Sequence, residues 1–204
     1  PLTNNIPYTN IVAVGETPDY YSFRVSPEAL SATFDVYDMS DDVQLLLRRA
    51  LPVPTFNDYD YALTNAGTAP ESIELTPFSF PIGLIPGDWY LSVVNASTNP
   101  ATYTVRASEV VATVIPLTNG VPYNNSLTPG TGLQYYQFLV SSNATAAEFL
   151  LTSAGAGNLD LFVRRGPPLP GAGNAHYSGT NLGVVDERIQ LDTNSLPVPL
   201  GPGL

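Results

Sequence analysis

Acidic side chains in several short turns of this sequence could bind a metal ion. Calcium takes several oxygen ligands, mostly carboxylates and carbonyls, and the chain gathers aspartates in a few turns. None of these groups has the spacing of an EF-hand, and acidic turns are common without a metal. We therefore expect no metal and no other cofactor, with calcium as the alternative. The calcium candidates are Asp38, Asp41, Asp42, Asp58, Asp60, Asp160 and Asp186.

Nucleophilic catalysis has few residues to draw on. A nucleophile needs a positioned base, but the chain has one histidine, His176, and no cysteine. His176 lies in a glycine-containing stretch, residues 171–177, which we interpret as a solvated loop. No phosphate-binding loop, dinucleotide fingerprint or zinc-ligand spacing is present. The sequence therefore predicts no catalytic residues and no enzymatic activity.

Two further residue types could act at the surface. Asn95, Asn124 and Asn143 stand in sequons for N-glycosylation. The chain also has 12 tyrosines, several of them adjacent, as at Tyr20 and Tyr21. Adjacent residues of a strand face opposite sides, so one of each pair is expected in the core or at its rim. A binding face, on which an exposed tyrosine stacks on a sugar or contacts a protein, is the alternative.

The charge balance excludes two classes of partner. Seven Lys and Arg against 18 Asp and Glu give a formal net charge of −11, whereas nucleic acids and anionic membranes need a cationic face. No apolar run approaches the ~20 residues that span a bilayer, so we expect no membrane insertion. Charged residues make up only 12% of the chain, which favours a secreted, extracellular or cell-surface protein. The first residue is Pro1, not Met, which predicts a processed product or a cut fragment.

A tandem repeat positions these residues. The sequence PLTNNIPY at residues 1–8 returns as PLTNGVPY at residues 116–123, an offset of 116 − 1 = 115. An apolar run, an arginine pair and a proline-containing turn occur at residues 43–54 and again at residues 159–170. Such self-similarity predicts two domains: residues 1–109 and 116–204, joined by a short, stiff linker at residues 110–115.

The second copy stops short of the first. Nothing in it corresponds to the two strands expected at residues 89–95 and 101–107. Short alternating runs between turn signals predict an all-β chain, with two tandem β-sandwiches of jelly-roll or Greek-key type. The second sandwich is expected to lack its last two strands. Its predicted core residues are Phe149, Leu161 and Val163, and those of the first are Phe34, Leu45, Leu47 and Trp89.

The order of these motifs resembles the bacterial pre-peptidase C-terminal domain. A turn leads into DYYSF at residues 19–23, and an apolar strand such as NLDLFV at residues 158–163 follows. A short Ile-x-Leu strand and the closing PGDWYLSV at residues 86–93 complete the pattern. The resemblance covers the first copy and most of the second. It implies a non-catalytic, extracellular β-sandwich module of the kind appended to secreted peptidases, some of which bind collagen and calcium. Gln44 replaces Asp160 in the first copy, which weakens a calcium role there.

Two functions stay open. The first is a non-catalytic extracellular structural or interaction protein, whose second domain is completed by strands of a neighbouring copy, so that copies form a head-to-tail filament. Residues 1–14 or 108–115 would be the donor. The alternative is a substrate-targeting, protein- or polysaccharide-binding module of a secreted peptidase or other hydrolase. The missing strands have two further explanations: a longer chain whose additional residues or domains complete the sandwich, and a naturally minimal domain.

Overall fold

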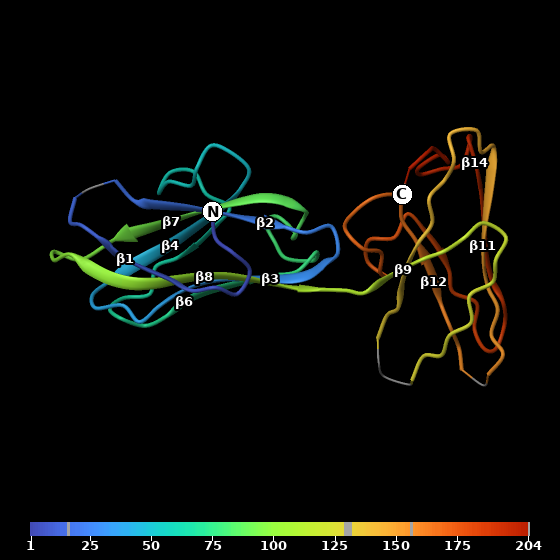
Figure 1. Ribbon diagram of the computed structural model, residues 1–204, viewed down its shortest axis with the longest axis horizontal. Coiled ribbons are helices and arrows are strands. Elements are labelled where there is room, and N and C mark those ends of the chain that lie inside the picture. The colour runs from blue at the N-terminus through green and yellow to red at the C-terminus, as the bar shows by residue number, and fades with distance from the viewer. Residues whose placement is uncertain (16, 129–131, 156, 204) are drawn as a thin grey trace. The chain divides into compact units, whose positions relative to one another are not determined.

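The computed structural model describes residues 1–15, 17–128, 132–155 and 157–203 (Figure 1). These residues form strands and no helix, which confirms the predicted all-β class. No helix in the described ranges could therefore cross a membrane. The chain divides into two compact units, Pro1–Ala112 and Thr113–Leu204, and each is described by itself.

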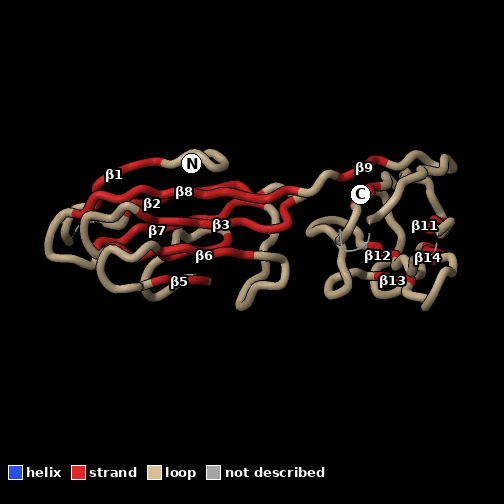
Figure 2. Tube along the Cα trace, turned by 90° about the horizontal axis from the view of Figure 1, so that it is seen from below, coloured by secondary structure: helices blue, strands red, loops and turns tan. Residues whose placement is uncertain are grey.

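The first unit consists of two four-stranded antiparallel sheets (Figure 2). In both sheets the strands next to each other in space are mostly far apart in sequence. The first sheet has the order β1 (Tyr8–Val12), β8 (Ala101–Val111), β3 (Ala29–Tyr37) and β6 (Glu71–Leu75). The second has the order β2 (Asp19–Val25), β7 (Gly87–Asn95), β4 (Val43–Arg49) and β5 (Tyr61–Leu63). Strands β8 and β7 are thus inner strands with a neighbour on each side.

Alternating apolar residues build one core between these sheets. Phe34 of β3 contacts the rings of Phe23 and Trp89, each with ring centroids 6.1 Å away. Phe34, Leu45, Leu47 and Trp89 are fully buried, which confirms the four core residues predicted for the first copy. Because both sheets contribute to one hydrophobic cluster, the first unit is a β-sandwich.

The second unit has shorter strands. In its described part, β11 (Ala146–Leu151) pairs antiparallel with β14 (Glu187–Asp192), and β12 (Leu161–Val163) pairs antiparallel with β13 (Tyr177–Gly179). β10 (Tyr135–Gln137) pairs with β9 (Val114–Pro116) in parallel. Residues 110–111 belong to β8 and residues 114–115 to β9, so most of the linker predicted at residues 110–115 lies in strands.

The repeat extends to strand register. Phe34 faces Ile73 across β3 and β6, and Phe149 faces Ile189 across β11 and β14. The offsets are 149 − 34 = 115 and 189 − 73 = 116. Likewise Leu47 faces Tyr61, and Val163 faces Tyr177. Strands β11, β14, β12 and β13 are therefore the counterparts of β3, β6, β4 and β5.

No strand of the described second unit corresponds to β7 or β8. The counterpart of β1, residues 123–127, forms no strand either. In the first unit β1 is held by β8, so a missing β8 counterpart explains this loss. The absence of two inner strands, one from each sheet, distinguishes the second unit from the first.

Candidate functional site

The candidate site is the place in the second unit where the counterparts of β7 and β8 would lie. In the first unit β3 lies between β8 and β6, and β4 lies between β7 and β5. Their counterparts β11 and β12 each pair on one side only within the described residues. An unpaired edge presents a row of free N–H and C=O groups and is a template for another strand. We call these two edges, together with the apolar side chains between them, the strand acceptor.

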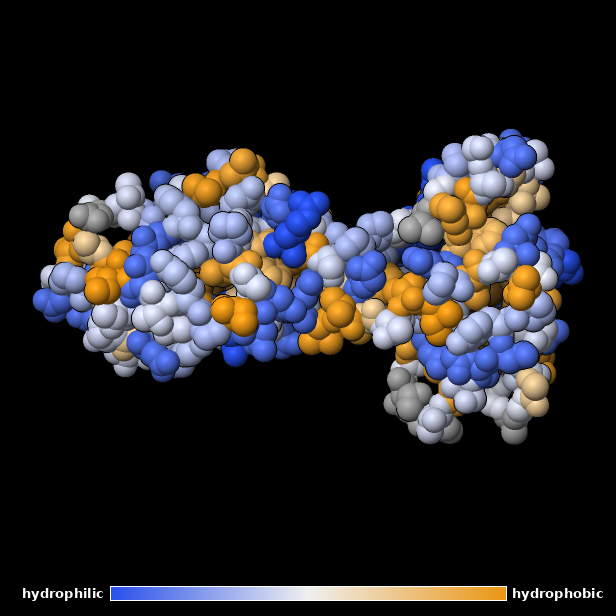
Figure 3. All heavy atoms as spheres, viewed as in Figure 1, coloured by the Kyte–Doolittle hydropathy of each residue, from blue (hydrophilic) through white to orange (hydrophobic). Residues whose placement is uncertain are grey.

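Loss of burial is clear on the strands that border the acceptor. Phe149, Leu161 and Val163 are only half-buried, although their counterparts in the first unit are fully buried. Ile189 and Leu191 on β14, which lies away from the acceptor, remain buried like their counterparts Ile73 and Leu75. The second core predicted from sequence is therefore present, but its side chains are incompletely buried on the side of the strand acceptor. Figure 3 shows hydrophobic residues at the surface of this unit.

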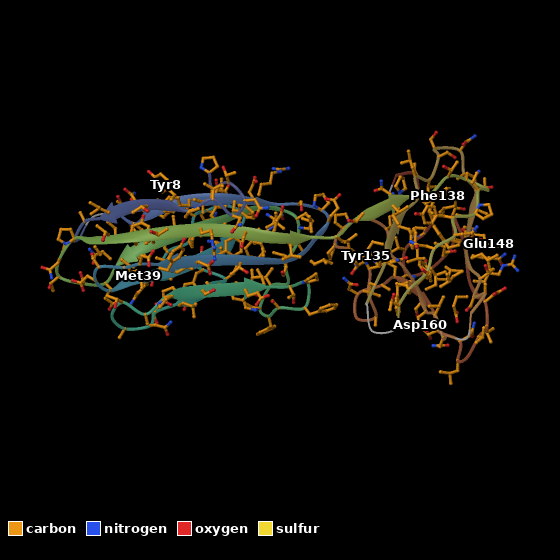
Figure 4. The ribbon with its side chains drawn as sticks, turned by 60° about the horizontal axis from the view of Figure 1, so that its bottom comes forward. Tyr8, Met39, Tyr135, Phe138, Glu148 and Asp160 are labelled. Carbon is orange, nitrogen blue, oxygen red and sulfur yellow. The ribbon has the colours of Figure 1, made fainter. Side chains whose placement is uncertain are left out.

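One aromatic contact of the core is retained. Phe138 and Phe149 meet edge to face with ring centroids 6.0 Å apart, like Phe23 and Phe34 in the first unit. Phe138 and Tyr135 mark the segment around β10 in Figure 4. In the first unit Trp89 of β7 contacts Phe34, the counterpart of Phe149, with ring centroids 6.1 Å apart. Within the described second unit, no third aromatic ring contacts Phe138 or Phe149.

Val140 and Gly203 form an isolated antiparallel bridge in the second unit. Val140 and Gly203 exchange two backbone hydrogen bonds, of 3.0 and 3.1 Å. Their counterparts Val25 and Gly87 form the first pair of the β2–β7 ladder. Arg165 also donates to the Pro202 carbonyl at 3.3 Å, as Arg49 donates to the Pro86 carbonyl at 2.6 Å. An incoming strand that continues this pairing would run antiparallel to β10.

Buried polar contacts keep the rest of the framework alike in both units. The Asn181 N–H and side-chain amide donate to Glu187 at 2.7 and 3.0 Å. Asn65 donates to Glu71 in the same way, at 2.7 and 2.9 Å. Both glutamates are fully buried, and burial raises the pKa of Glu71. Sequence reasoning missed this contact, although the Asn-x5-Glu spacing recurs at an offset of 187 − 71 = 116.

His176 supports the arginine pair and is not a freely solvated loop residue. It is half-buried, and its Nδ1 accepts a hydrogen bond from the Arg165 N–H at 3.2 Å. In the first unit the Asp60 carboxylate accepts from the Arg49 N–H at 2.6 Å. Burial, and secondarily the positive charge of Arg164, lowers the pKa of His176. A neutral imidazole suits this position, because Nδ1 must carry a free lone pair to accept.

The calcium candidates of the first unit have separate partners. Asp58 forms an ion pair with Arg48, and Asp60 binds the Arg49 N–H. Asp41 accepts from the Asp42 N–H at 2.8 Å and from the Asn99 amide at 3.2 Å. These hydrogen bonds, that of the Asp42 backbone first, lower the pKa of Asp41. One oxygen of Asp42 is buried without a hydrogen-bond partner, and Asp38 is exposed at a positive φ of 52°.

The second unit disperses its candidates in the same manner. Asp160, labelled in Figure 4, accepts from the Asn158 amide at 3.2 Å. Asp186 is exposed, and its backbone carbonyl accepts from Asn181 at 3.4 Å. Across the described residues no group of three or more His, Cys, Asp or Glu side chains is placed to hold a metal ion. The geometry supplies no calcium cage from these residues.

The three sequons differ in accessibility. The Asn95 side-chain amide donates to the carbonyls of Val12 and Asn99, at 3.0 and 2.8 Å. Asn124 and Asn143 are exposed. A glycan on Asn95 would replace two hydrogen bonds that tie the end of β7 to its surroundings. Asn124 and Asn143 are free of this conflict.

Both proposed donor segments are paired within their own chain. Within residues 1–14, Tyr8–Val12 forms β1 and pairs with β8. Within residues 108–115, the first part belongs to β8 and pairs with β3, and Val114 and Ile115 pair with β10. The structure thus describes the acceptor and leaves neither donor candidate unpaired.

No protein-family model and no curated protein matches the chain. The resemblance to pre-peptidase C-terminal domains therefore stays a prediction from motif order.

Proposed function

We propose that this chain is a non-catalytic, extracellular structural protein whose second unit is completed by β-strands from a neighbouring copy. The observation that carries the proposal is the strand acceptor. Two strands, β11 and β12, are paired on one side only in the described structure. The antiparallel Val140–Gly203 bridge supports an antiparallel direction for a strand added beside Val140. Main-chain pairing of this kind is the usual mode of β-augmentation.

The gain from completion has two sources. Unpaired edge groups would acquire hydrogen bonds, and half-buried apolar side chains such as Phe149 and Leu161 would leave water. In the first unit this task falls to β7 and β8, whose buried residues include Trp89, Leu91 and Val105. A donor should therefore present an apolar side chain at every second position, with a large one near the Phe138–Phe149 pair.

The direction of assembly follows from the asymmetry of the contact. The acceptor lies in the second unit, and any donor must be a different surface of the neighbouring copy. Contacts between unlike surfaces form a closed ring only when the rotation from one copy to the next adds up to a full turn. Otherwise they continue from copy to copy as a head-to-tail filament. The extracellular setting is supported by the low charge content of 12%, and the unreactive, dispersed acidic side chains support a non-catalytic role.

Photo-crosslinking tests the proposal and identifies the donor. The crosslinker p-benzoylphenylalanine is placed at Phe149, in chains that are mixed as ¹⁴N and ¹⁵N forms before irradiation. We expect crosslinked peptides of mixed isotope composition, because the partner belongs to another copy. Mass spectrometry then shows whether that partner lies in residues 1–14, in residues 108–115 or elsewhere.

The matched control is the same crosslinker at Phe34, the counterpart that is fully buried in the complete first unit. It should yield crosslinks within one chain only. Crosslinks from the Phe149 position that likewise stay within one chain would contradict strand exchange between copies.

A further inference from the structure

An open pocket of about 460 Å³ lies at the surface of the first unit, between the chain start and the beginning of β2. No residue of β3, β4, β7 or β8 lines it, and several of its lining residues lie within residues 1–14, one of the two candidate donor segments. Its walls combine aromatic and aliphatic side chains with a few polar groups, which is the usual composition of small-ligand sites. Those lining residues that the argument uses are Ile6, Tyr8, Asn10, Asp19, Tyr20 and Tyr21.

The second copy repeats this constellation. At the common offset of 115, Ile6 corresponds to Val121, and Tyr8, Tyr20 and Tyr21 correspond to tyrosines. The geometry is repeated as well. Tyr8 and Tyr21 meet edge to face with centroids 5.9 Å apart, and Tyr123 and Tyr136 do so at the same distance.

Two of the repeated side chains are also equally exposed. Tyr8 and Tyr123 are 52% and 53% exposed, and Ile6 and Val121 are 57% and 59% exposed. Packing of the core does not explain why large apolar side chains recur where water reaches them. In the second unit residues 123–127 form no strand, so pairing with β8 does not explain it either.

Other exposed aromatic residues show no such retention. Phe56, Tyr59 and Phe78 are exposed in the first unit, yet their counterparts are Ala172, Ala175 and Asn194. The two copies have thus diverged at exposed aromatic positions outside the pocket while keeping those that line it. This contrast indicates that the pocket and its counterpart around Tyr123 and Tyr136 have the same function.

Polar groups beside the rings indicate the chemistry of a ligand. One carboxylate oxygen of Asp19 accepts from the Asn10 amide at 3.1 Å and from the Tyr103 hydroxyl at 2.6 Å. The other takes no hydrogen bond from any described residue and is free to accept from a hydroxyl. In the second copy the Gln134 carbonyl oxygen takes the role of the carboxylate, accepting from the Asn125 amide at 3.1 Å and from Tyr136 at 2.8 Å.

We propose that the pocket and its counterpart around Tyr123 and Tyr136 are equivalent binding sites for neutral sugar residues of a polysaccharide or glycan. A pyranose ring offers an apolar C–H face to a half-exposed tyrosine and a hydroxyl that can donate to the second carboxylate oxygen of Asp19. Asp19 and the net charge of −11 repel phosphate, sulfate and uronate groups. A proline-rich peptide also fits aromatic grooves, but it offers carbonyl acceptors where the first pocket presents a carboxylate acceptor.

Affinity electrophoresis of the intact chain tests the assignment. The gels contain mannan, dextran, xylan or mixed-linkage β-glucan, and the matching gels contain no polysaccharide. We expect retardation by at least one of these neutral polymers. Tyr8→Ala and Tyr123→Ala should each weaken it, and the double variant should lower the apparent affinity by about tenfold or more, because two sites on one chain act together.

Control variants separate stacking from folding and from peptide binding. Tyr8→Phe with Tyr123→Phe keeps both rings and should keep most of the retardation. Tyr59→Ala removes an exposed tyrosine outside the pocket and should change nothing. The assignment is wrong if no neutral polymer retards the chain, or if the folded double alanine variant is retarded as before. Saturable binding of a polyproline peptide that the alanine variants abolish would also overturn it.

Discussion

At the residue scale, equivalent side chains in the two copies differ mainly in how far they are covered. Phe34 and Phe149 hold the same position in the strand register and contact equivalent aromatic partners. Only Phe34 is fully buried, because β7 and β8 close the core above it. The same residue type should therefore contribute unequally to the stability of the two units.

Truncation of these two phenylalanines tests that inequality. Phe34→Ala should cost about 3–5 kcal/mol, the usual range for a fully buried phenylalanine. Phe149→Ala should cost clearly less in the isolated chain, because its side chain is already partly in water. Trp89 is the sole tryptophan and reports unfolding of the first unit, and hydrogen exchange at β14 reports the second. Equal losses in both units would show that the second core is closed.

His176 predicts a pH response of the second unit. Its pKa is lowered in the folded state, so its contribution to stability is present above about pH 6.5, the ordinary value for histidine. That contribution is lost as the pH falls through the lowered pKa. Protonation would place an N–H against the Arg165 N–H, which now donates to Nδ1.

The variant His176→Asp provides the comparison, because the first copy has Asp60 at this position. Hydrogen-exchange protection factors of β12 and β13, which are corrected for the intrinsic pH dependence of exchange, should fall between pH 7.5 and 5.5 more in the native chain than in the variant. Identical pH profiles would exclude His176 as the source. Glu71 has the opposite sign: its raised pKa contributes stability that is lost as pH rises, and it lies in the other unit.

At the element scale, the strand acceptor should accept the strands that its register describes. A synthetic peptide with the sequence of residues 87–111, which span β7 and β8 in the first unit, supplies Trp89, Leu91, Val93 and the strand that follows. We expect it to bind the second unit, slow hydrogen exchange in β11 and β12, and inhibit association between copies. A peptide in which Trp89, Leu91 and Val93 are changed to serine should have none of these three effects. Equal effects of both peptides would contradict recognition by register.

Strand positions were predictable where the pattern is local. The turn before residues 19–25 and the apolar run at residues 43–49 predict β2 and β4 with their observed bounds. The same pattern predicts strands at residues 133–140 and 158–165, but β10 and β12 cover only Tyr135–Gln137 and Leu161–Val163. A strand is as long as its pairing, and these two strands lack the neighbour that pairs with β2 and β4.

The sites were harder to predict for a similar reason. Comparison of the two copies from sequence alone located the missing strands, because no segment of the second copy corresponds to residues 89–95 or 101–107. It did not show that these two segments are the inner strands of two different sheets, since pairing of β8 with β1 and β3 joins distant segments. The tyrosine pocket also depends on a non-local arrangement, in which the chain start lies beside β2.

At the scale of the whole molecule, we expect no structural role for a metal. Four of the seven calcium candidates, Asp41, Asp58, Asp60 and Asp160, contact arginine, amide or backbone groups, and the described residues provide no cluster of three ligands. Addition of EDTA should therefore leave the melting temperature of both units unchanged. A large decrease that calcium reverses would show that a carboxylate site forms in solution, and Asp42 with its unpartnered buried oxygen would be the first residue to mutate.

Sedimentation velocity of the 204-residue chain over a wide concentration range shows directly whether copies join through the second unit. If the second unit takes up strands of a neighbouring copy, the chain forms a concentration-dependent series of head-to-tail oligomers rather than one closed species. The β7–β8 peptide should shift that series toward monomers. Monodisperse monomers at every concentration, with the edges of β11 and β12 fully protected from hydrogen exchange, would contradict completion by another copy.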